Sequence, residues 1–445
     1  METTALATAR AVQSGETSAR AVCEATIARI EERDSTLNAV VVRDFERARA
    51  AADQVDARIA AGERLALAGV AMTVKESFDV AGLPTTWGFE EHREYRPAED
   101  ALAVRKLTAA GAVIVGKTNV PPALADLQST NPVYGRTNNP FDRSRVSGGS
   151  SGGSAVALAS GMVPLELGSD IGGSIRVPAH FNGVWGHKPT FGALPRDGHH
   201  FPRTDGHPGP LSVIGPLARD PADLAAALDL LADPSLPKAQ DRPVDRLRVL
   251  VLTSHPVAPV HPGIAEAVAH LGEALARAGA QVEWNHPLLP DQSKQFADYM
   301  RLLSVTLARG APSEDGISAS LPDWFGMLDE QARTSRGWSR LFTEVDAVIA
   351  PVLGVPAFPH SDVALRQRTL PIDGSDTMFG LQFGWPGLAT YPNRPATAFP
   401  IGLVDGLPVG AQVIADLHRD HDAIAIAARA HTLIGAPAPQ PFQGA

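Results

Sequence analysis

Apolar residues near the start of the chain recur with the spacing of amphipathic helices. Thr17 or Ser18 can cap a first helix that runs to about Arg33, because a short side-chain oxygen accepts hydrogen bonds from the first free amides. Asp44 can open a second helix whose apolar face ends before Gly62. This pattern predicts two outer helices at the start of the chain.

Short apolar runs then alternate with helical patterns, which is typical of a sheet with crossover helices. Residues 68–74 and 112–116 predict buried strands, and residues 101–110 between them predict a helix. Further along, a strand at 246–253, a helix at 263–278 and the stretch AQVEW form a unit that favours parallel pairing of its two strands.

The end of the chain supplies more strands, at residues 345–351 and 407–415, and a last helix at 421–434. No repeat of fixed period and no long low-complexity linker separates these segments. Strands of one sheet therefore come from both ends of the chain, and the pattern predicts one α/β domain.

Composition and charge exclude several classes of protein. The chain has 445 residues, of which 44% are hydrophobic and 20% charged, as in a globular protein with a sizeable core. A net charge of -10 gives no overall attraction to phosphate backbones, so we expect no nucleic acid partner. Neither a signal peptide nor an apolar run of about 18 residues is present, so we expect no membrane span and a cytoplasmic location. The single cysteine, Cys23, excludes an intrachain disulfide.

One stretch, GAVIVGKT at residues 111–118, matches the expression of a phosphate-binding loop at every position. A phosphate cradle needs a flexible loop that starts a helix, whereas the interior here is a β-branched run suited to a strand. Pro121 and Pro122 also delay helix formation. We therefore interpret the stretch as a buried strand with an exposed Lys117, and a nucleotide-binding protein stays a remote alternative.

Residues 146–161, VSGGSSGGSAVALASG, are built almost entirely of glycine, serine and small apolar residues. They are not a slack linker, because they lead into a predicted helix and strand and then into a second glycine loop, SDIGGSIR. Gly172 and Gly173 leave backbone amides free to face an anion, and Ser174 holds a hydroxyl group beside them. The two loops predict two walls of one site that contains an oxyanion hole.

The segment from Ser147 to Thr190 resembles the signature of the amidase signature family of serine hydrolases. Its glycine-serine loop is followed by D-x-G-G-S-[IV]-R, P-A and G-x-K-P-T, over more than forty residues. The resemblance extends through GVAMTVKESFDVAGLPTTWG, VYGRTNNPFD, SVIGPLARDPADL and GLPVGAQVIA, so it covers most of the chain. Residues 285–344 match least.

The resemblance implies an α/β fold made of a single domain, with a central mixed, largely parallel twisted sheet covered by helices on both faces. Within residues 1–445 it implies a helical N-terminal region at about 1–62 and a signature core at about 66–232. It also implies a variable substrate-pocket region at about 285–344 and a sheet-completing part at about 345–445.

The resemblance also implies a Ser-cisSer-Lys triad. The nucleophile falls on Ser174, the bridging serine on Ser150 with a cis peptide bond before it, and the lysine on Lys75 in MTVKE. A serine hydroxyl needs a base to take its proton, and Lys75 can be that base only if burial among Val70, Met72 and Val74 keeps it neutral.

Other site residues follow from the same motif. The oxyanion hole falls on the backbone amides of Ile171, Gly172, Gly173 and Ser174. Ser151 and Asp170 are expected to support the loops through hydrogen bonds. Arg176 is expected either to pair with internal acids or to bind a substrate carboxylate.

The predicted function is hydrolysis of a small linear or aryl amide through an acyl-enzyme on Ser174, with esters or carbamates as further substrates. An alternative within the family is the glutaminase-like subunit of a tRNA-dependent amidotransferase, which requires a partner protein. The tryptophans in and around residues 285–344 would suit an aryl pocket, and core packing explains each of them equally well.

No cofactor and no metal are expected. The cluster GHHFPRTDGH, with His199, His200, Asp205 and His207, lacks the i, i+4 histidine pair of a zinc protease and is interpreted as a polar loop. A small-molecule amide is the expected ligand, and a homodimer is compatible with the resemblance.

Overall fold

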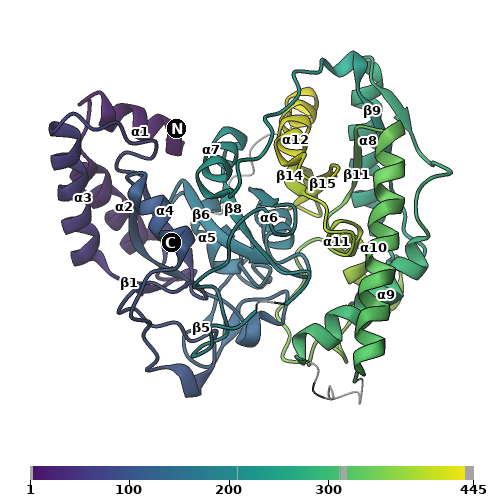
Figure 1. The fold of residues 1–445 in the computed structure, drawn as a ribbon, viewed down its shortest axis with the longest axis horizontal. Coiled ribbons are helices and arrows are strands. Elements are labelled where there is room, and N and C mark those ends of the chain that lie inside the picture. Colours follow the sequence, from purple (N-terminus) through teal and green to yellow (C-terminus); the bar gives the residue numbers. More distant parts are fainter. Residues whose placement is uncertain (1–3, 208, 310, 312–317, 436–445) are drawn as a thin grey trace.

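The computed structural model describes residues 4–207, 209–309, 311 and 318–435. Figure 1 shows helices α1, α2 and α3 gathered at one end of the molecule and helices α8, α9 and α10 at the other, with the sheet between them. Chain segments from the beginning, middle and end of the sequence contribute to this sheet, as one α/β domain requires.

Eleven strands among the described residues form one sheet in the order β1-β3-β2-β6-β8-β7-β14-β15-β11-β9-β10. The strands are β1 (Val40–Arg43), β2 (Ala71–Lys75), β3 (Val113–Thr118), β6 (Leu165–Asp170), β7 (Trp185–Lys188), β8 (Val213–Ala218), β9 (Arg248–Val251), β10 (Gln281–Glu283), β11 (Ala347–Pro351), β14 (Ala396–Val404) and β15 (Leu407–Ile414). Two further pairs lie outside it: β4 (Thr130–Asn131) with β5 (Gly135–Arg136), and β12 (Thr369–Ile372) with β13 (Ser375–Met378).

The sheet is mixed, as expected. Strands β3, β2 and β6 run parallel at one flank, and β11, β9 and β10 run parallel at the other. The strands between these flanks pair antiparallel, from β6 through β8, β7, β14 and β15 to β11. The predicted parallel pairing therefore holds at the two flanks, where helical connections separate successive strands.

The helices include those that the sequence pattern predicts by range, but α1, which precedes the first predicted helix, was not predicted. They are α1 (Ala5–Gln13), α2 (Ala19–Arg33), α3 (Phe45–Ala60), α4 (Leu102–Ala109), α5 (Gly152–Ala159), α6 (Arg176–Asn182), α7 (Pro221–Leu231), α8 (Pro262–Arg277), α9 (Gln292–Leu307), α10 (Leu321–Glu344), α11 (Gly384–Thr390) and α12 (Asp420–Ile434). Ser18 caps α2, since its side chain accepts a hydrogen bond from the Ala21 amide at 3.0 Å. The predicted first helix and its cap are confirmed.

Helices cover both faces of the sheet, and β7 shows this directly. A Cβ added at Gly186 would lie 3.1 Å from Cβ of Ala179 in α6, whereas the next residue, His187, contacts Asp420 in α12 at 3.2 Å. Because successive strand residues point to opposite faces, α6 and α12 lie on opposite sides of the sheet.

The stretch that matches a phosphate-binding loop is strand β3, which pairs parallel with β2. The strand is confirmed, but the expected exposure of Lys117 is wrong. Its side chain is fully buried, and Nζ donates to Thr85 Oγ1 at 2.9 Å and to the carbonyl of Pro84. The negative charges of Glu76 and Asp79 favour the protonated form of this lysine, although burial lowers its pKa to about 8.

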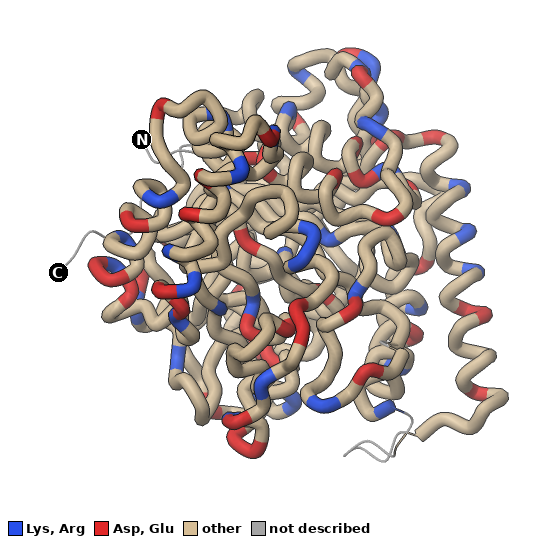
Figure 2. The backbone as a smooth tube through the Cα atoms, turned by 60° about the vertical axis from the view of Figure 1, so that its left-hand side comes forward, with Lys and Arg blue, Asp and Glu red and all other residues tan. Residues whose placement is uncertain are grey.

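Charged positions of both signs are interspersed along the chain (Figure 2). In the part of the chain that the structure describes, no helix combines the length and the apolar character needed to cross a membrane. Cys23 is buried in α2, as its apolar neighbours indicate.

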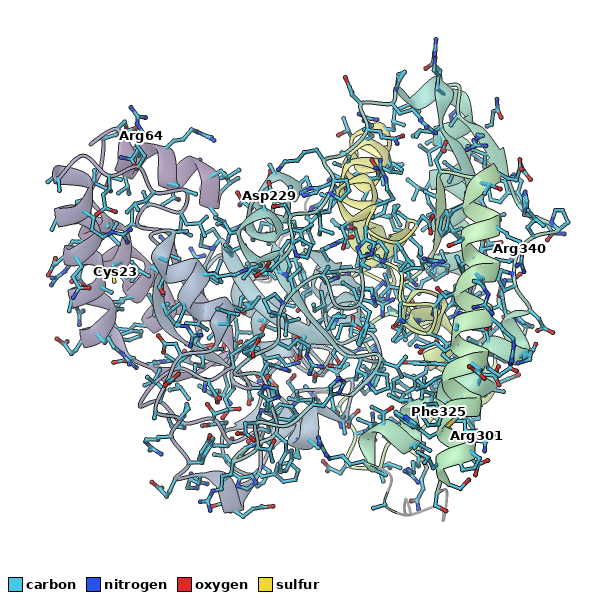
Figure 3. All side chains as sticks on the ribbon, in the orientation of Figure 1. Cys23, Arg64, Asp229, Arg301, Phe325 and Arg340 are labelled. Carbon is cyan, nitrogen blue, oxygen red and sulfur yellow. The ribbon has the colours of Figure 1, made fainter. Side chains whose placement is uncertain are left out.

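Helix α10 shows how the C-terminal half is anchored. Trp338 is fully buried between this helix and the sheet, and its indole N–H donates to Gln295 Oε1 of α9 at 2.9 Å. Phe325 lies on the same helix with 60% of its surface exposed, and Figure 3 labels it near the outer edge of the molecule.

Trp338→Ala should therefore lower the free energy of unfolding by about 3–5 kcal/mol, because it removes a large buried ring and leaves a cavity. Phe325→Ala is the matched control and should change stability by less than about 0.5 kcal/mol. Urea unfolding followed by circular dichroism measures both variants. Equal losses in the two variants would contradict this packing.

Candidate active site

Two adjacent parallel strands end at the same edge of the sheet, β2 at Lys75 and β6 at Asp170. Their register pairs Thr73 with Glu166 and places the following residues of both strands side by side. The carboxyl ends of strands are where α/β sheets usually bind ligands. The two glycine loops, before α5 and before α6, meet at this edge, because the Ser151 amide donates to the carbonyl of Ser174 at 3.2 Å.

The side chain of Lys75 makes two short hydrogen bonds. Its Nζ donates to Ser150 Oγ at 2.7 Å and to Ser169 Oγ at 2.9 Å. The peptide bond between Gly149 and Ser150 is cis, in agreement with the resemblance. The lysine and the expected bridging serine are thus in direct contact, although 75 residues separate them in sequence.

Lys75 is fully buried, and this environment changes its protonation. Burial lowers the pKa of Lys75 to about 7, because the ammonium form loses its hydration, while the carboxyl groups of Asp170 and Glu166 partly oppose the shift. An amine with such a pKa is substantially neutral at physiological pH, so it can accept a proton.

The first glycine loop packs backbone against backbone, which explains its composition. A Cβ added at Gly149 would collide with the carbonyl oxygen of Asp126, and one at Gly152 would collide with Ser129 Oγ. Ser129 joins the two ends of the turn, since its hydroxyl donates to the carbonyl of Gly148 and accepts from the Gly152 amide, both at 3.1 Å. Glycine is therefore required at these two positions, because neighbouring atoms lie too close for any side chain.

The second glycine loop presents unpaired amides next to Ser174. The N–H groups of Ile171, Gly172 and Ser174 donate to no group among the described residues. Gly173 differs from the expectation, because its N–H donates to Asp170 Oδ1 at 2.9 Å and is therefore occupied. Ser174 is almost fully buried, and its Oγ has no hydrogen-bond partner within the described ranges.

Aromatic side chains form a wall beside this loop. The hydroxyl group of Tyr299, from α9, donates to the carbonyl of Ile171 at 2.8 Å and holds the loop in place. A Cβ added at Gly172 would lie 2.9 Å from the ring of Phe383, so only glycine leaves room here. The two buried rings therefore pack against the loop that leads to Ser174.

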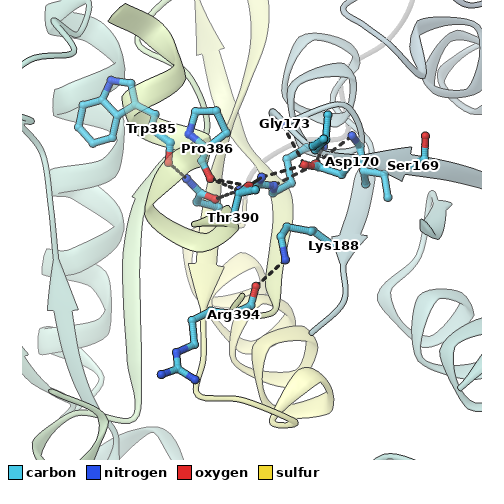
Figure 4. A network of polar contacts seen from close by, with 12 residues as sticks. Ser169, Asp170, Gly173, Lys188, Trp385, Pro386, Thr390 and Arg394 are labelled. Carbon is cyan, nitrogen blue, oxygen red and sulfur yellow. Dashed lines mark hydrogen bonds and ion pairs between the residues drawn. The ribbon is translucent and has the colours of Figure 1, made fainter. Parts of the chain in front are cut away.

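Asp170 and Arg176 form a fully buried ion pair with an N–O distance of 3.0 Å (Figure 4). Further guanidinium hydrogen bonds reach the carbonyl of Pro386 at 3.0 Å, Gln412 Oε1 at 2.8 Å and Thr390 Oγ1 at 2.8 Å. Arg176, with loop amides, holds the pKa of Asp170 at about 2 in spite of its burial. This geometry favours the supporting role of both residues over the binding of a substrate carboxylate by Arg176.

A family model described as Amidase matches residues 21–311 and 320–423 of the chain. The chain belongs to the amidase signature family. It is therefore related to hydrolases of carbon–nitrogen bonds, and this amidase has the single-domain fold of that family.

Three known proteins show the range of similarity. AtzE, which belongs to the 1-carboxybiuret hydrolase of Pseudomonas sp. (strain ADP), is 47% identical over 226 residues, which are 50% of this chain and 48% of that one. A component of the glutamyl-tRNA(Gln) amidotransferase of Deinococcus deserti is 32% identical over 95% of both chains. The crystal structure of a bacterial aryl acylamidase of the same family superposes with a TM-score of 0.83, at 27% identity, over 99% of both chains.

Two asparagines stabilise the chain near the site. The side-chain amide of Asn182 donates to the carbonyl of Ser147 at 2.7 Å, which supports the first glycine loop. Asn393 has φ of 65°, a left-handed conformation that asparagine tolerates.

A cavity of about 440 Å³ lies between α9, α10 and the segment that follows His200. Val305, Thr306 and Trp324 line it on the helical side, and His207 and Pro210 line it on the other. The region expected to be variable therefore contributes one aromatic side chain to a cavity, while Trp338 belongs to the core.

The histidine cluster does not gather around one point. His199 is buried and shares a hydrogen bond of 3.0 Å with Ser77, whereas His207 is exposed. Within the described residues, no group of three or more His, Cys, Asp or Glu side chains is arranged to hold a metal ion.

Sequence reasoning missed three residues of this site. Ser169 was not recognised as a partner of Lys75, although it directly precedes Asp170 in the motif and β6 lies beside β2. Tyr299 and Phe383 were missed because they come from segments with no motif. Only the folded chain brings them to Gly172.

Arg176→Met should lower the free energy of unfolding by about 3–5 kcal/mol near neutral pH, because it leaves the Asp170 carboxylate buried without its cation. The loss should shrink as the pH falls from 7 towards 2, since burial without the cation raises the pKa of Asp170 in the variant, whereas the wild-type carboxylate stays ionised down to about 2. Urea unfolding between pH 3 and pH 7 measures both effects.

The control is Arg93→Met, which removes a cation from an exposed ion pair with Glu90. This variant should lose less than about 1 kcal/mol at any pH. If Arg176→Met were as stable as this control, the assigned network around Asp170 would be wrong.

Proposed function

We propose that this amidase hydrolyses a small linear or aryl amide through an acyl-enzyme on Ser174, with Lys75 as the base and Ser150 as the proton relay. The observation that carries the proposal is the buried hydrogen bond of 2.7 Å between Lys75 and Ser150, beside a glycine loop that ends in Ser174. No histidine donates to or accepts from these three side chains among the described residues.

In the first step, Ser174 Oγ attacks the carbonyl carbon of the amide. Its proton passes to Ser150 Oγ while the proton of Ser150 passes to Lys75 Nζ, which becomes an ammonium group. The hydrogen bond from Ser174 to Ser150 is not formed in this structure, and such contacts commonly tighten only when substrate binds. Since Lys75 must start neutral, kcat/KM should rise with pH through about 7.

The negative charge that develops on the carbonyl oxygen needs donors that are already in place. The free N–H groups of Ile171, Gly172 and Ser174 are the candidates, and each good donor contributes about 3 kcal/mol to transition-state stability in other serine hydrolases. We omit Gly173 from this set, because Asp170 already accepts its hydrogen bond.

The tetrahedral intermediate then collapses and the carbon–nitrogen bond breaks. Lys75 returns its proton through Ser150 to the leaving nitrogen, which departs as a neutral amine. Water attacks the ester of Ser174 by the same relay, and the carboxylic acid leaves. The step consumes one water and needs no cofactor.

We infer an aryl or apolar acyl group for the substrate. The similar solved structure of a bacterial aryl acylamidase supports this class, and the rings of Phe383 and Tyr299 pack against the loop at Gly172. Esters and carbamates undergo the same acyl transfer and are expected as further substrates. A homodimer and a cytoplasmic location stay predictions.

The glutaminase component of a tRNA-dependent amidotransferase is a second candidate, because one such protein from Deinococcus deserti is similar over 95% of both chains. The two functions separate when the isolated chain is offered glutamine and an anilide. If the isolated chain hydrolyses the anilide, the result supports the amidase. If it hydrolyses glutamine and not the anilide, the result supports the amidotransferase role.

A serine-directed fluorophosphonate should label Ser174 and no other residue, because only an activated hydroxyl attacks phosphorus at a useful rate. Mass spectrometry of the digested adduct locates the label. Ser151→Ala keeps the nearby triad and should still be labelled, whereas Ser174→Ala should not. A label on Ser150 or Ser151 in the wild type would overturn these roles.

A further inference from the structure

Glu166 is a buried acid that takes no part in the proposed steps of the reaction. It lies on β6 opposite Thr73 of β2, and only 1% of its surface is exposed. Thr73 and Lys75 are two residues apart on β2, so their side chains leave the same face of the sheet. The Glu166 carboxyl group therefore lies behind Lys75, on the side away from the strand ends.

No cation pairs with this carboxyl group within hydrogen-bonding distance in the described part of the chain. The Leu167 amide donates to Oε2 at 2.9 Å, and Oε1 has no hydrogen bond of normal geometry. The hydroxyl groups of Thr73, Thr118 and Ser154 lie close enough to stabilise the ionised form. Burial nevertheless dominates and raises the pKa of Glu166 to about 7.

The elements packed against β6 bring no competing charge to this group. Neither α5 nor β8 contains a titratable residue. On β3, Lys117 directs its ammonium group to Pro84 and Thr85, while Thr118 faces Ser154 at 2.9 Å. Lys75 is thus the cation whose charge Glu166 influences.

Two acids, Asp170 and Glu166, favour the ammonium form of Lys75, and His199 lies nearby. Asp170 has the larger effect on Lys75, but its carboxylate is held in the buried ion pair with Arg176. His199 stays neutral, because burial holds its pKa well below the usual value. Glu166 is the remaining acid near Lys75, and it has no such compensating partner.

We propose that Glu166 is a positioning residue that acts through Lys75: its buried carboxyl group sets the basicity of the lysine and so the pH at which the relay works. The proposal rests on the proposed function, since it requires Lys75 to be the base. A carboxylate beside Lys75 favours the ammonium form, so it counteracts the loss of basicity that burial imposes. Lys75 then draws the proton from Ser150 more strongly during attack.

The sign of the effect is defined. Removing the carboxyl group removes a charge that favours ammonium, so Lys75 loses its proton at lower pH. The ascending limb of kcat/KM should move to lower pH by up to about one unit, since a pKa of about 7 leaves Glu166 only partly ionised across the limb. The plateau above the limb should fall, because a less basic lysine is a weaker proton acceptor.

Glu166→Gln and Glu166→Leu test this with pH profiles of kcat/KM on a chromogenic anilide between pH 5 and pH 9. Both variants remove the charge but differ in shape and hydrogen bonding, so an electrostatic role predicts shifts in the same direction. A purely structural role would lower activity without moving the limb. Circular dichroism at each pH excludes unfolding as the cause of a change.

The matched control is Glu76→Gln. Glu76 follows Lys75 directly and is equally buried, but it accepts from the Thr86 amide at 2.6 Å and the Trp87 amide at 3.0 Å, and its charge partner is Lys117. This variant should leave the ascending limb where it is in the wild type.

The outcomes separate the two proposals. A wild-type enzyme without an ascending limb near pH 7, or without label on Ser174, contradicts the proposed function itself. A wild-type limb that neither Glu166 variant moves contradicts the role of Glu166 alone. A limb that Glu76→Gln moves equally also overturns it, because the shift would then be an unspecific effect of removing a buried acid.

Discussion

Burial of the Lys75 ammonium group at the end of β2 is the constraint on which the site depends. Taking an ammonium group out of water is costly unless it loses its proton or finds partners. Here both occur, since Ser150 and Ser169 accept its hydrogen bonds and its pKa falls to about 7. The fold keeps the lysine away from water, because it lies on a strand that is buried on both sides. A lysine of ordinary basicity would be protonated in this pH range and could not act as a base.

The C-terminal part of the chain holds the nucleophile loop in position. Asp170 accepts the Gly173 amide, and Arg176 ties this carboxylate to Gln412 on β15 and to the carbonyl of Pro386 in α11. The strands that complete the sheet therefore also fix the geometry of the loop. β14 and β15 complete the middle of the sheet, and β15 supplies a hydrogen-bond acceptor for Arg176. This explains why Arg176 is shielded from solvent and committed to internal partners.

Much of this could be predicted from the sequence, and the limits have physical causes. The short apolar run at residues 68–74 predicted the strand that ends at Lys75, because such a run depends only on neighbouring residues. The glycine and serine content of residues 146–161 and of SDIGGSIR indicated the two loops that border the site. The partners of Arg176 could not be predicted, since Gln412 is 236 residues away and no local pattern encodes such a contact. Lys117 was misjudged for a similar reason, because its counter-charge, Glu76, lies on the neighbouring strand end.

The central claim is that Lys75 is a neutral amine at physiological pH, and its titration can be observed directly. Protein labelled with ¹³C at the lysine ε-carbons would be titrated by heteronuclear NMR, with the Lys75 signal assigned by its absence in Lys75→Met. The account predicts a signal that titrates near pH 7, well below the ordinary lysine value of 10.5. A Lys75 signal that stays in the ammonium form up to about pH 10 would contradict it.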